Sequence, residues 1–248
     1  MTLALGIDIK LAVAASIVAV VATSTGSGAA SVRRGVANTR LGMFLEVATS
    51  AGAISGAFLA IALGAQVLVA LFGVALVAAI PFMLRPLGAP KNGGAGLVPA
   101  ILHPSRLRLS GHFEDSKDNL VAYEVHRPGT GFLLSGLAGV VSGLLGIGGG
   151  IIKVPTMRGA MGVPMKVAVG TSNFMIGVTA AAAALVFFGR GAVDPVLAST
   201  AALGVVVGSR YATRVVERID THRLVLVFSA VLALMALSMF LKAGGVLP

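Results

Sequence analysis

The chain has 248 residues, of which 56% are hydrophobic and 11% are charged, and its net charge is +10. A soluble domain carries about 25% charged residues, so this composition excludes an ordinary soluble globule and predicts an integral membrane protein. The absence of cysteine excludes disulfide and thiol chemistry, and the four scattered histidines fit no metal-ligand spacing. Excess Lys and Arg would suggest nucleic acid as the partner of a soluble protein, but in a membrane protein they set orientation. We therefore expect the lipid bilayer as a partner, and no nucleic acid, metal or cofactor.

Six apolar runs each approach the length of about 20 residues that a membrane-spanning helix needs. Three of them precede a polar segment and three follow it. The chain is therefore predicted to be an all-α polytopic membrane protein with six spanning helices. The runs cover residues 11–31, 41–63, 66–84, 167–188, 196–214 and 223–241.

The polar segment, residues 86–130, contains a pattern typical of a small β-hairpin. Apolar residues alternate with polar ones in two short stretches, 106–113 and 120–126, which flank a run of charged and polar residues. We expect this hairpin to lie outside the membrane.

The next segment, from Gly131 to about Met161, is apolar but has four glycines among the five residues from 146 to 150. Each glycine weakens a helix by about 1 kcal/mol relative to alanine, so this cluster predicts a broken helix. In hydrocarbon, a broken backbone is tolerated only where protein or a water-filled cavity satisfies its polar groups. The cluster therefore indicates a binding site, and the alternative is that its small residues only allow close helix packing.

The two halves of the chain resemble each other at a shift of 156 positions without gaps. Between residues 5 and 57 there are ten identities in 53 pairs, and Thr23 falls on Thr179. Repeats are a common construction of secondary transporters. The glycine-rich stretch 131–156 has no counterpart in the first half, so we expect an incomplete first repeat at 1–85, a loop at 86–130 and a second repeat at 131–248.

The distribution of basic residues favours a glycine-broken segment that enters the membrane and returns on the same side. With such a re-entrant hairpin, one side of the membrane holds only Lys10, Arg190 and Lys242, and the other 16 of the 19 basic residues lie opposite. The positive-inside rule then places the 16 on the cytoplasmic side, and the repeats become inverted. A straight seventh crossing gives almost no charge bias and is left open.

Three segments resemble the TauE/SafE family of sulfite exporters. They are residues 136–155, 168–172 and 189–194, and the polar hairpin around Ser110–Phe113 and Tyr123 is also similar. The resemblance implies a multi-pass protein of the bacterial inner membrane that transports small anions such as sulfite, sulfonates or other sulfur-containing organic anions. The family normally has a glycine-rich element in each half, and this chain lacks the first.

The substrate site is predicted at the glycine break. A half-helix beginning near Ile151 would point its N–H groups and its partial positive charge at an anion, and the glycines would let the anion approach the backbone. Thr171, Ser172 and Asn173 offer further donors, although a helix cap or an interhelical hydrogen bond would equally explain them. The predicted substrate-binding residues are Gly146, Gly148, Gly149, Gly150, Lys153, Thr171, Ser172, Asn173 and, as the weaker partner from the other repeat, Ser16.

Two charged residues have two interpretations each. Lys153 either adds positive charge along the route of the substrate or extends to the interface. Glu46, inside an apolar run, either carries a coupling proton or pairs with Arg40 near the interface.

These features predict a permease or exporter of a small anion that is driven by an ion or substrate gradient, since the chain has no phosphate-binding loop for ATP. An anion channel and a non-transporting, truncated membrane subunit are the alternatives. An enzyme is not expected, because the apolar segments contain no paired carboxylates and no nucleophile–base spacing. The formation of a homo-oligomer is left open.

Overall fold

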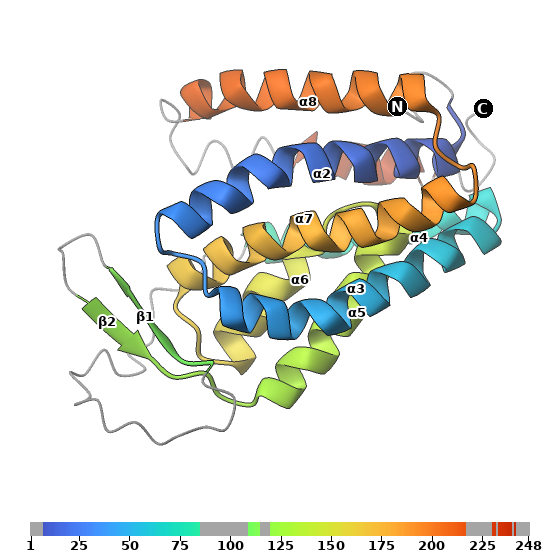
Figure 1. Cartoon of the computed structure of the whole chain (residues 1–248). Coiled ribbons are helices and arrows are strands. Elements are labelled where there is room, and N and C mark those ends of the chain that lie inside the picture. Colours follow the sequence, from blue (N-terminus) through green and yellow to red (C-terminus); the bar gives the residue numbers. More distant parts are fainter. Residues whose placement is uncertain are drawn as a thin grey trace.

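The computed structural model describes residues 7–84, 109–114, 120–216, 230–231, 233–239 and 241. It is a bundle of helices with a two-stranded hairpin at one end (Figure 1). The elements are α2 (Ile9–Arg33), α3 (Thr39–Ala62), α4 (Ala65–Leu84), β1 (Gly111–Glu114), β2 (Leu120–Tyr123), α5 (Pro128–Leu145), α6 (Gly150–Pro155), the π-helix η1 (Thr156–Ala160), α7 (Met165–Gly189) and α8 (Pro195–Val216).

Within the described residues, four helices are long and apolar enough to cross a membrane by their length and composition: α2, α3, α5 and α7. Shorter apolar helical stretches cover 65–78 in α4 and 195–209 in α8. The prediction of a helical, multi-pass membrane protein is thus confirmed. The count of six spans stays a prediction, because nine of the 19 residues 223–241, among them the first seven, lie outside the described part of the chain.

The turns that follow α2 and α7 have the same backbone geometry. Gly35 and Gly191 have φ angles of 65° and 64°, and each turn leads to a helix whose first N–H groups bind an Asn or Asp side chain. Asn38 Oδ1 accepts from the backbone N of Leu41 at 3.0 Å, and Asp194 Oδ1 accepts from the backbone N of Leu197 at 3.0 Å. In each turn, three successive backbone N–H groups donate to carbonyl oxygens of the preceding helix, at the same spacings. The pairs are Arg34 to Ala30, Gly35 to Val32 and Val36 to Ser31 in the first turn, and Arg190 to Val186, Gly191 to Phe188 and Ala192 to Phe187 in the second.

Helices α3 and α5 pack with their backbones in contact. A Cβ atom at Gly139 would overlap the carbonyl oxygen of Thr49, and a Cβ at Gly52 would overlap that of Gly136. Small residues allow this close approach, which is the usual way for helices to associate in lipid. Glycine therefore allows close helix packing in α3 and in the body of α5.

The predicted β-hairpin is present, with β1 antiparallel to β2 and Gly111 opposite Tyr123. It is attached to the bundle through Asn38, whose Nδ2 donates to the carbonyl oxygen of Leu109 and to the hydroxyl oxygen of Tyr123, both at 2.8 Å. Burial raises the pKa of Tyr123, although the hydrogen bond from Asn38 acts in the opposite direction. Leu109 and Val125 are buried in the core beneath the hairpin.

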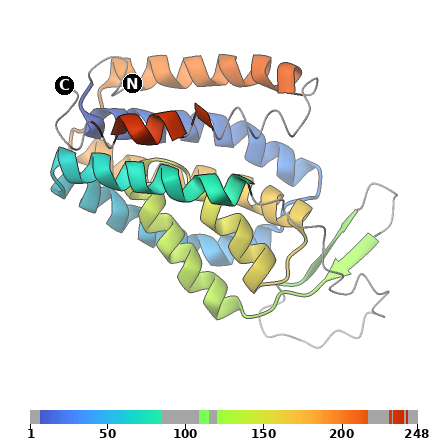
Figure 2. The same cartoon turned by 180° about the vertical axis from the view of Figure 1, so that it is seen from behind.

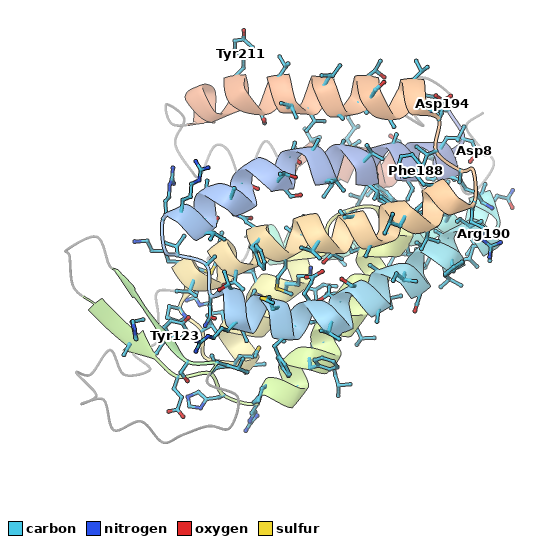
Figure 3. All side chains as sticks on the ribbon, viewed as in Figure 1. Asp8, Tyr123, Phe188, Arg190, Asp194 and Tyr211 are labelled. Atoms are coloured by element: carbon cyan, nitrogen blue, oxygen red, sulfur yellow. The ribbon has the colours of Figure 1, made fainter. Side chains whose placement is uncertain are left out.

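The end of the bundle opposite the hairpin carries Asp8, Arg190 and Asp194 (Figure 3). There the Nζ of Lys10 donates to the carbonyl oxygen of Ile61 at 2.7 Å, and the guanidinium of Arg190 lies over the Phe58 ring, 5.2 Å from its centroid.

Candidate functional site

The glycine-rich segment is a broken helix, as predicted. Helix α5 ends at Leu145 and α6 begins at Gly150, and between them Gly146, Gly148 and Gly149 have φ angles of 71°, 76° and 67°. Residues with a side chain rarely adopt these angles, so the break depends on glycine. Gly149 precedes the first turn of α6, and no side chain caps its N–H groups.

After the break, the chain doubles back along α5. Figure 2 shows α6 beside α5, and the two helices are in contact. The backbone N of His126, before α5, donates to the carbonyl oxygen of Met161, after η1, at 3.0 Å. Helices α5, α6 and η1 thus form a helical hairpin, and its two ends meet at the same end of the bundle. Pro155, which has no N–H, is the last residue of α6, and the backbone continues as the π-helix η1.

The break packs against α2 and α7, and Gly148 and Gly149 are buried. A Cβ atom placed on each glycine shows what surrounds it. At Gly146 it would approach Ser16 Oγ, and at Gly148 it would lie 3.2 Å from Ile176 Cγ2. At Gly149 it would lie 3.0 Å from the carbonyl oxygen of Ala138 and 3.5 Å from Lys153 Cε. At Gly150 it would lie 3.5 Å from Ser172 Oγ.

Lys153 is 1% exposed and lies inside the bundle. Its side chain extends toward the start of its own helix, as helical side chains do, so that Cε lies beside Gly149. Its Nζ donates to Thr179 Oγ1 on α7 at 2.7 Å. Of the two interpretations of Lys153, the extension to the interface is therefore wrong.

Glu46, on α3, is 7% exposed and points into the same interior. Its Oε1 accepts from Thr179 Oγ1 at 2.7 Å and from Ser50 Oγ at 2.8 Å. The proposed pairing with Arg40 is wrong, because Arg40 is exposed and residues six apart lie on different faces of a helix. Instead, one threonine hydroxyl joins a buried carboxylate to a buried ammonium group.

Three buried side-chain atoms among the described residues have no hydrogen-bond partner: Glu46 Oε2, Ser135 Oγ and Ser172 Oγ. Buried polar atoms are normally paired, and an exception needs an explanation such as a missing water or ligand. Ser172 is 1% exposed and its Oγ faces Gly150 at the start of α6. The N-terminus of α6 therefore has an unpaired hydroxyl on one side and the Lys153 side chain on the other.

The other predicted donors have different surroundings. Thr171 Oγ1 accepts from the backbone N of Asn38 at 2.9 Å, which is an interhelical hydrogen bond. Helix α7 begins at Met165, so Thr171, Ser172 and Asn173 are not part of its cap. Asn173 is partly buried, and Ser16 Oγ donates to the carbonyl oxygen of Val13 at 2.8 Å.

Sequence reasoning missed Thr179, Ser135 and Ser142, which are all buried. Thr179 was visible as an identity with Thr23 in the shifted alignment, but nothing local in the sequence indicates that it bridges two charges. Ser135 and Ser142 are seven residues apart on α5 and so share a face, and the Cβ of Ser142 lies beside Gly149.

Two cavities of about 450 and 380 Å³ are open on the surface, and neither is lined by residues 146–150. The larger lies between α3 and α7 near Arg190 and Phe58, and the smaller lies along α2 near Arg33.

The comparisons with known proteins agree with the helical membrane architecture. The chain is 23% identical over 226 residues to the "Probable membrane transporter protein YunE" of Bacillus subtilis (strain 168), an alignment that covers 91% of this chain and 78% of the relative. No solved structure matches the chain. The model of the sulfite exporter TauE/SafE family matches residues 1–239. The chain is an integral membrane protein that belongs to the sulfite exporter TauE/SafE family.

Proposed function

We propose that this protein transports a small sulfur oxyanion, such as sulfite or a sulfonate, which binds at the N-terminus of α6. The observation that carries the proposal is the convergence of three features at the break. They are the uncapped first turn of α6, the unpartnered hydroxyl of Ser172 and the buried side chain of Lys153.

These features suit an oxyanion because each supplies a hydrogen-bond donor or positive potential. The first N–H groups of a helix have no acceptor within it, and the helix dipole adds partial positive charge there. A serine hydroxyl has one O–H to donate. The ammonium of Lys153 has three N–H bonds and, among the described residues, a single protein acceptor, Thr179.

The carboxylate of Glu46 limits how strongly the site holds an anion. A buried ammonium group without a counter-charge would bind any small anion and release it slowly. With Glu46 joined to Lys153 through Thr179, the empty site is close to neutral. This balance suits transport, in which the substrate must leave as well as enter.

The wider architecture in this proposal has six spanning helices and a re-entrant hairpin, α5–α6–η1, in the inner membrane. The hydrogen bond between His126 and Met161 supports re-entry, since it joins the two ends of the hairpin. The matching turns at Gly35 and Gly191, 156 residues apart, support a duplication that relates 1–85 to 131–248. The loop between them, 86–130, and the end of the bundle that carries the β-hairpin face the cytoplasm.

Gly148 and Gly149 are buried, so an anion reaches them only when helices move apart. Both α2 and α7 contact the break, and movement of the hairpin against these two helices would open it. This is alternating access around a central site, and it distinguishes a transporter from a channel.

The test is uptake of radiolabelled sulfite and methanesulfonate into liposomes that contain the purified protein. We expect saturable uptake of at least one of these anions, and its loss in the variant Lys153→Met. Lys10→Met is the matched control, since Lys10 lies at one end of the bundle, and it should retain uptake. Failure of the wild-type protein to take up either anion would contradict the proposal, and uptake that rises without saturation would indicate a channel.

A further inference from the structure

We infer that the site takes up one proton with each monovalent anion, that Oε2 of Glu46 receives this proton, and that the hydroxyl of Thr179 switches acceptors when it does so. This inference rests on the proposed function and gives that function a coupling ion and a stoichiometry. It makes the movement of a monovalent sulfonate electroneutral.

The first step concerns Thr179, which connects the two charged groups. Its Oγ1 accepts a hydrogen bond from Lys153 Nζ at 2.7 Å. The same oxygen lies 2.7 Å from Glu46 Oε1 and 2.9 Å from the carbonyl oxygen of Met175. A threonine has one hydroxyl hydrogen, so Thr179 can donate to Glu46 or to Met175 at one time, but not to both.

The second step concerns the charge of the site. Among the described residues, Glu46 and Lys153 are the only buried charged side chains. They cancel each other when the site is empty. A bound monoanion beside Lys153 would leave one net negative charge in a buried environment, which is strongly unfavourable unless it is compensated.

The third step identifies how that charge is compensated. Another buried charge cannot balance it, because the elements packed around the pair contribute no further buried ionisable group among the described residues. Helix α2 contributes hydroxyl and apolar side chains, α7 contributes these and the amide of Asn173, and α5 contributes Ser135 and Ser142. The basic residues nearest in sequence to Lys153, Arg158 of η1 and Lys166 of α7, are partly buried and exposed, respectively. A carboxylate next to a second negative charge tends to take up a proton. Glu46 is therefore the group that neutralises the site.

The fourth step identifies the oxygen atom. Oε1 of Glu46 already accepts from Ser50 and lies within hydrogen-bond distance of Thr179, whereas Oε2 is buried and has no partner. A proton from bulk water that binds Oε2 makes the carboxyl group neutral. The hydroxyl hydrogen of Thr179 then turns to Met175, and Lys153 is left to pair with the anion.

The experiment measures protons that the purified protein takes up when it binds methanesulfonate, by calorimetry in buffers of different ionisation enthalpy. A sulfonate stays ionised over the working pH range, so any proton is taken up by the protein. We expect uptake of about one proton per bound anion, and binding that weakens as the pH rises. The Glu46→Gln variant should bind methanesulfonate without taking up a proton and without this pH dependence, whereas the control Glu124→Gln, at an exposed position, should behave like the wild type.

Thr179 is tested as a positioning residue with a conservative pair of variants. Thr179→Val removes the hydroxyl, and we expect roughly tenfold weaker binding at least, together with a shifted pH profile. Thr179→Ser keeps the hydroxyl and should restore both. A merely structural role for Thr179 would change affinity but leave the pH profile in place.

The outcomes separate this inference from the proposed function. Binding of methanesulfonate by the wild type without proton uptake overturns the inference and leaves the proposed site standing, as does unchanged proton uptake in Glu46→Gln. If the wild type binds neither methanesulfonate nor sulfite, the proposed function and the inference both fail. Since the measurement on the wild type alone decides the stoichiometry, misfolding of a variant would not remove the test.

Discussion

Helices α2 and α7 have the same length of 25 residues and are followed by turns of the same geometry, yet their interiors differ in chemistry. Thr23 in α2 and Thr179 in α7 are aligned by the shift of 156 residues. The Thr23 hydroxyl bonds only to carbonyl oxygens of its own helix, those of Ala19 and Val20. The Thr179 hydroxyl joins Lys153 to Glu46.

The difference between these threonines shows what the glycine-broken hairpin adds. Lys153, on α6, donates to Thr179, whereas the aligned Thr23 bonds to its own helix. A threonine in an apolar helix is thus only a local hydrogen-bonding group until another element brings a charge to it. The chemistry of the proposed site therefore depends on the hairpin of α5, α6 and η1, and comparing the positions that the shift of 156 aligns tests this dependence.

The largest effect is expected for Lys153→Met. It removes the one buried cation among the described residues and leaves Glu46 buried without a counter-charge, which should destabilise the fold by about 3–5 kcal/mol. Adding Glu46→Gln should restore most of the stability, because the pair is removed together, but should not restore anion binding. Thermal unfolding and methanesulfonate binding measure the two effects. Recovery of binding in the double variant would show that Lys153 has no part in the site.

The next effect is that of Thr179→Val compared with Thr23→Val. The first change removes hydrogen bonds to two charged groups and should cost about 3 kcal/mol. The second removes bonds to the backbone of its own helix, and its cost should be well under 1 kcal/mol, since such bonds support a helix weakly. Denaturation of both variants in one detergent measures the difference, and equal costs would mean that the bridge contributes no stability.

A similar comparison applies to Gly52 and Gly208, which the shift of 156 also aligns. Gly52→Ala places a methyl group against the carbonyl oxygen of Gly136 and should destabilise the protein by about 1–3 kcal/mol. Gly208 has nothing within 4 Å of an added Cβ, so Gly208→Ala should be neutral or slightly stabilising. Thermal unfolding of the two variants measures the difference, and a larger loss of stability in Gly208→Ala than in Gly52→Ala would contradict this interpretation.

The smallest effect on stability is expected for Ser172→Ala. Because its hydroxyl is buried without a partner, removing it should leave the free energy of unfolding unchanged or slightly higher. Binding of methanesulfonate should nevertheless weaken by about tenfold, since the anion loses one donor. Ser16→Ala should weaken binding less, because Ser16 already donates to Val13. An equal loss of binding in both variants would place the anion as near to Ser16 on α2 as to Ser172 on α7, which would contradict the proposed position.

The sequence predicted the elements that have strong local signals. The glycine cluster predicted the break, because four glycines oppose a helix whatever surrounds them. The alternating residues before 113 and after 120 predicted the β-hairpin for the same local reason. Lys153 was identified as a candidate because a charge close to such a break is conspicuous, and Ser172 because it is one of three polar residues at the start of the next apolar run.

The sequence could not predict which groups meet across the bundle. Glu46 lies 133 residues from Thr179, and its nearest basic neighbour in sequence, Arg40, suggested the wrong partner. Thr171 and Asn173 looked like equivalents of Ser172, but successive residues of a helix point in different directions. Of the three, only Ser172 faces the start of α6, and this depends on how α6 packs against α7.

The most direct test of the proposed site is a crystal structure of the protein with 2-bromoethanesulfonate, whose bromine is located by anomalous scattering. The chain contains no cysteine that this compound could alkylate. We predict a bromine peak beside the first turn of α6, with the sulfonate between Ser172 and Lys153. A peak only in the surface cavity near Arg190 and Phe58, with the glycine break unoccupied, would contradict binding at the broken helix.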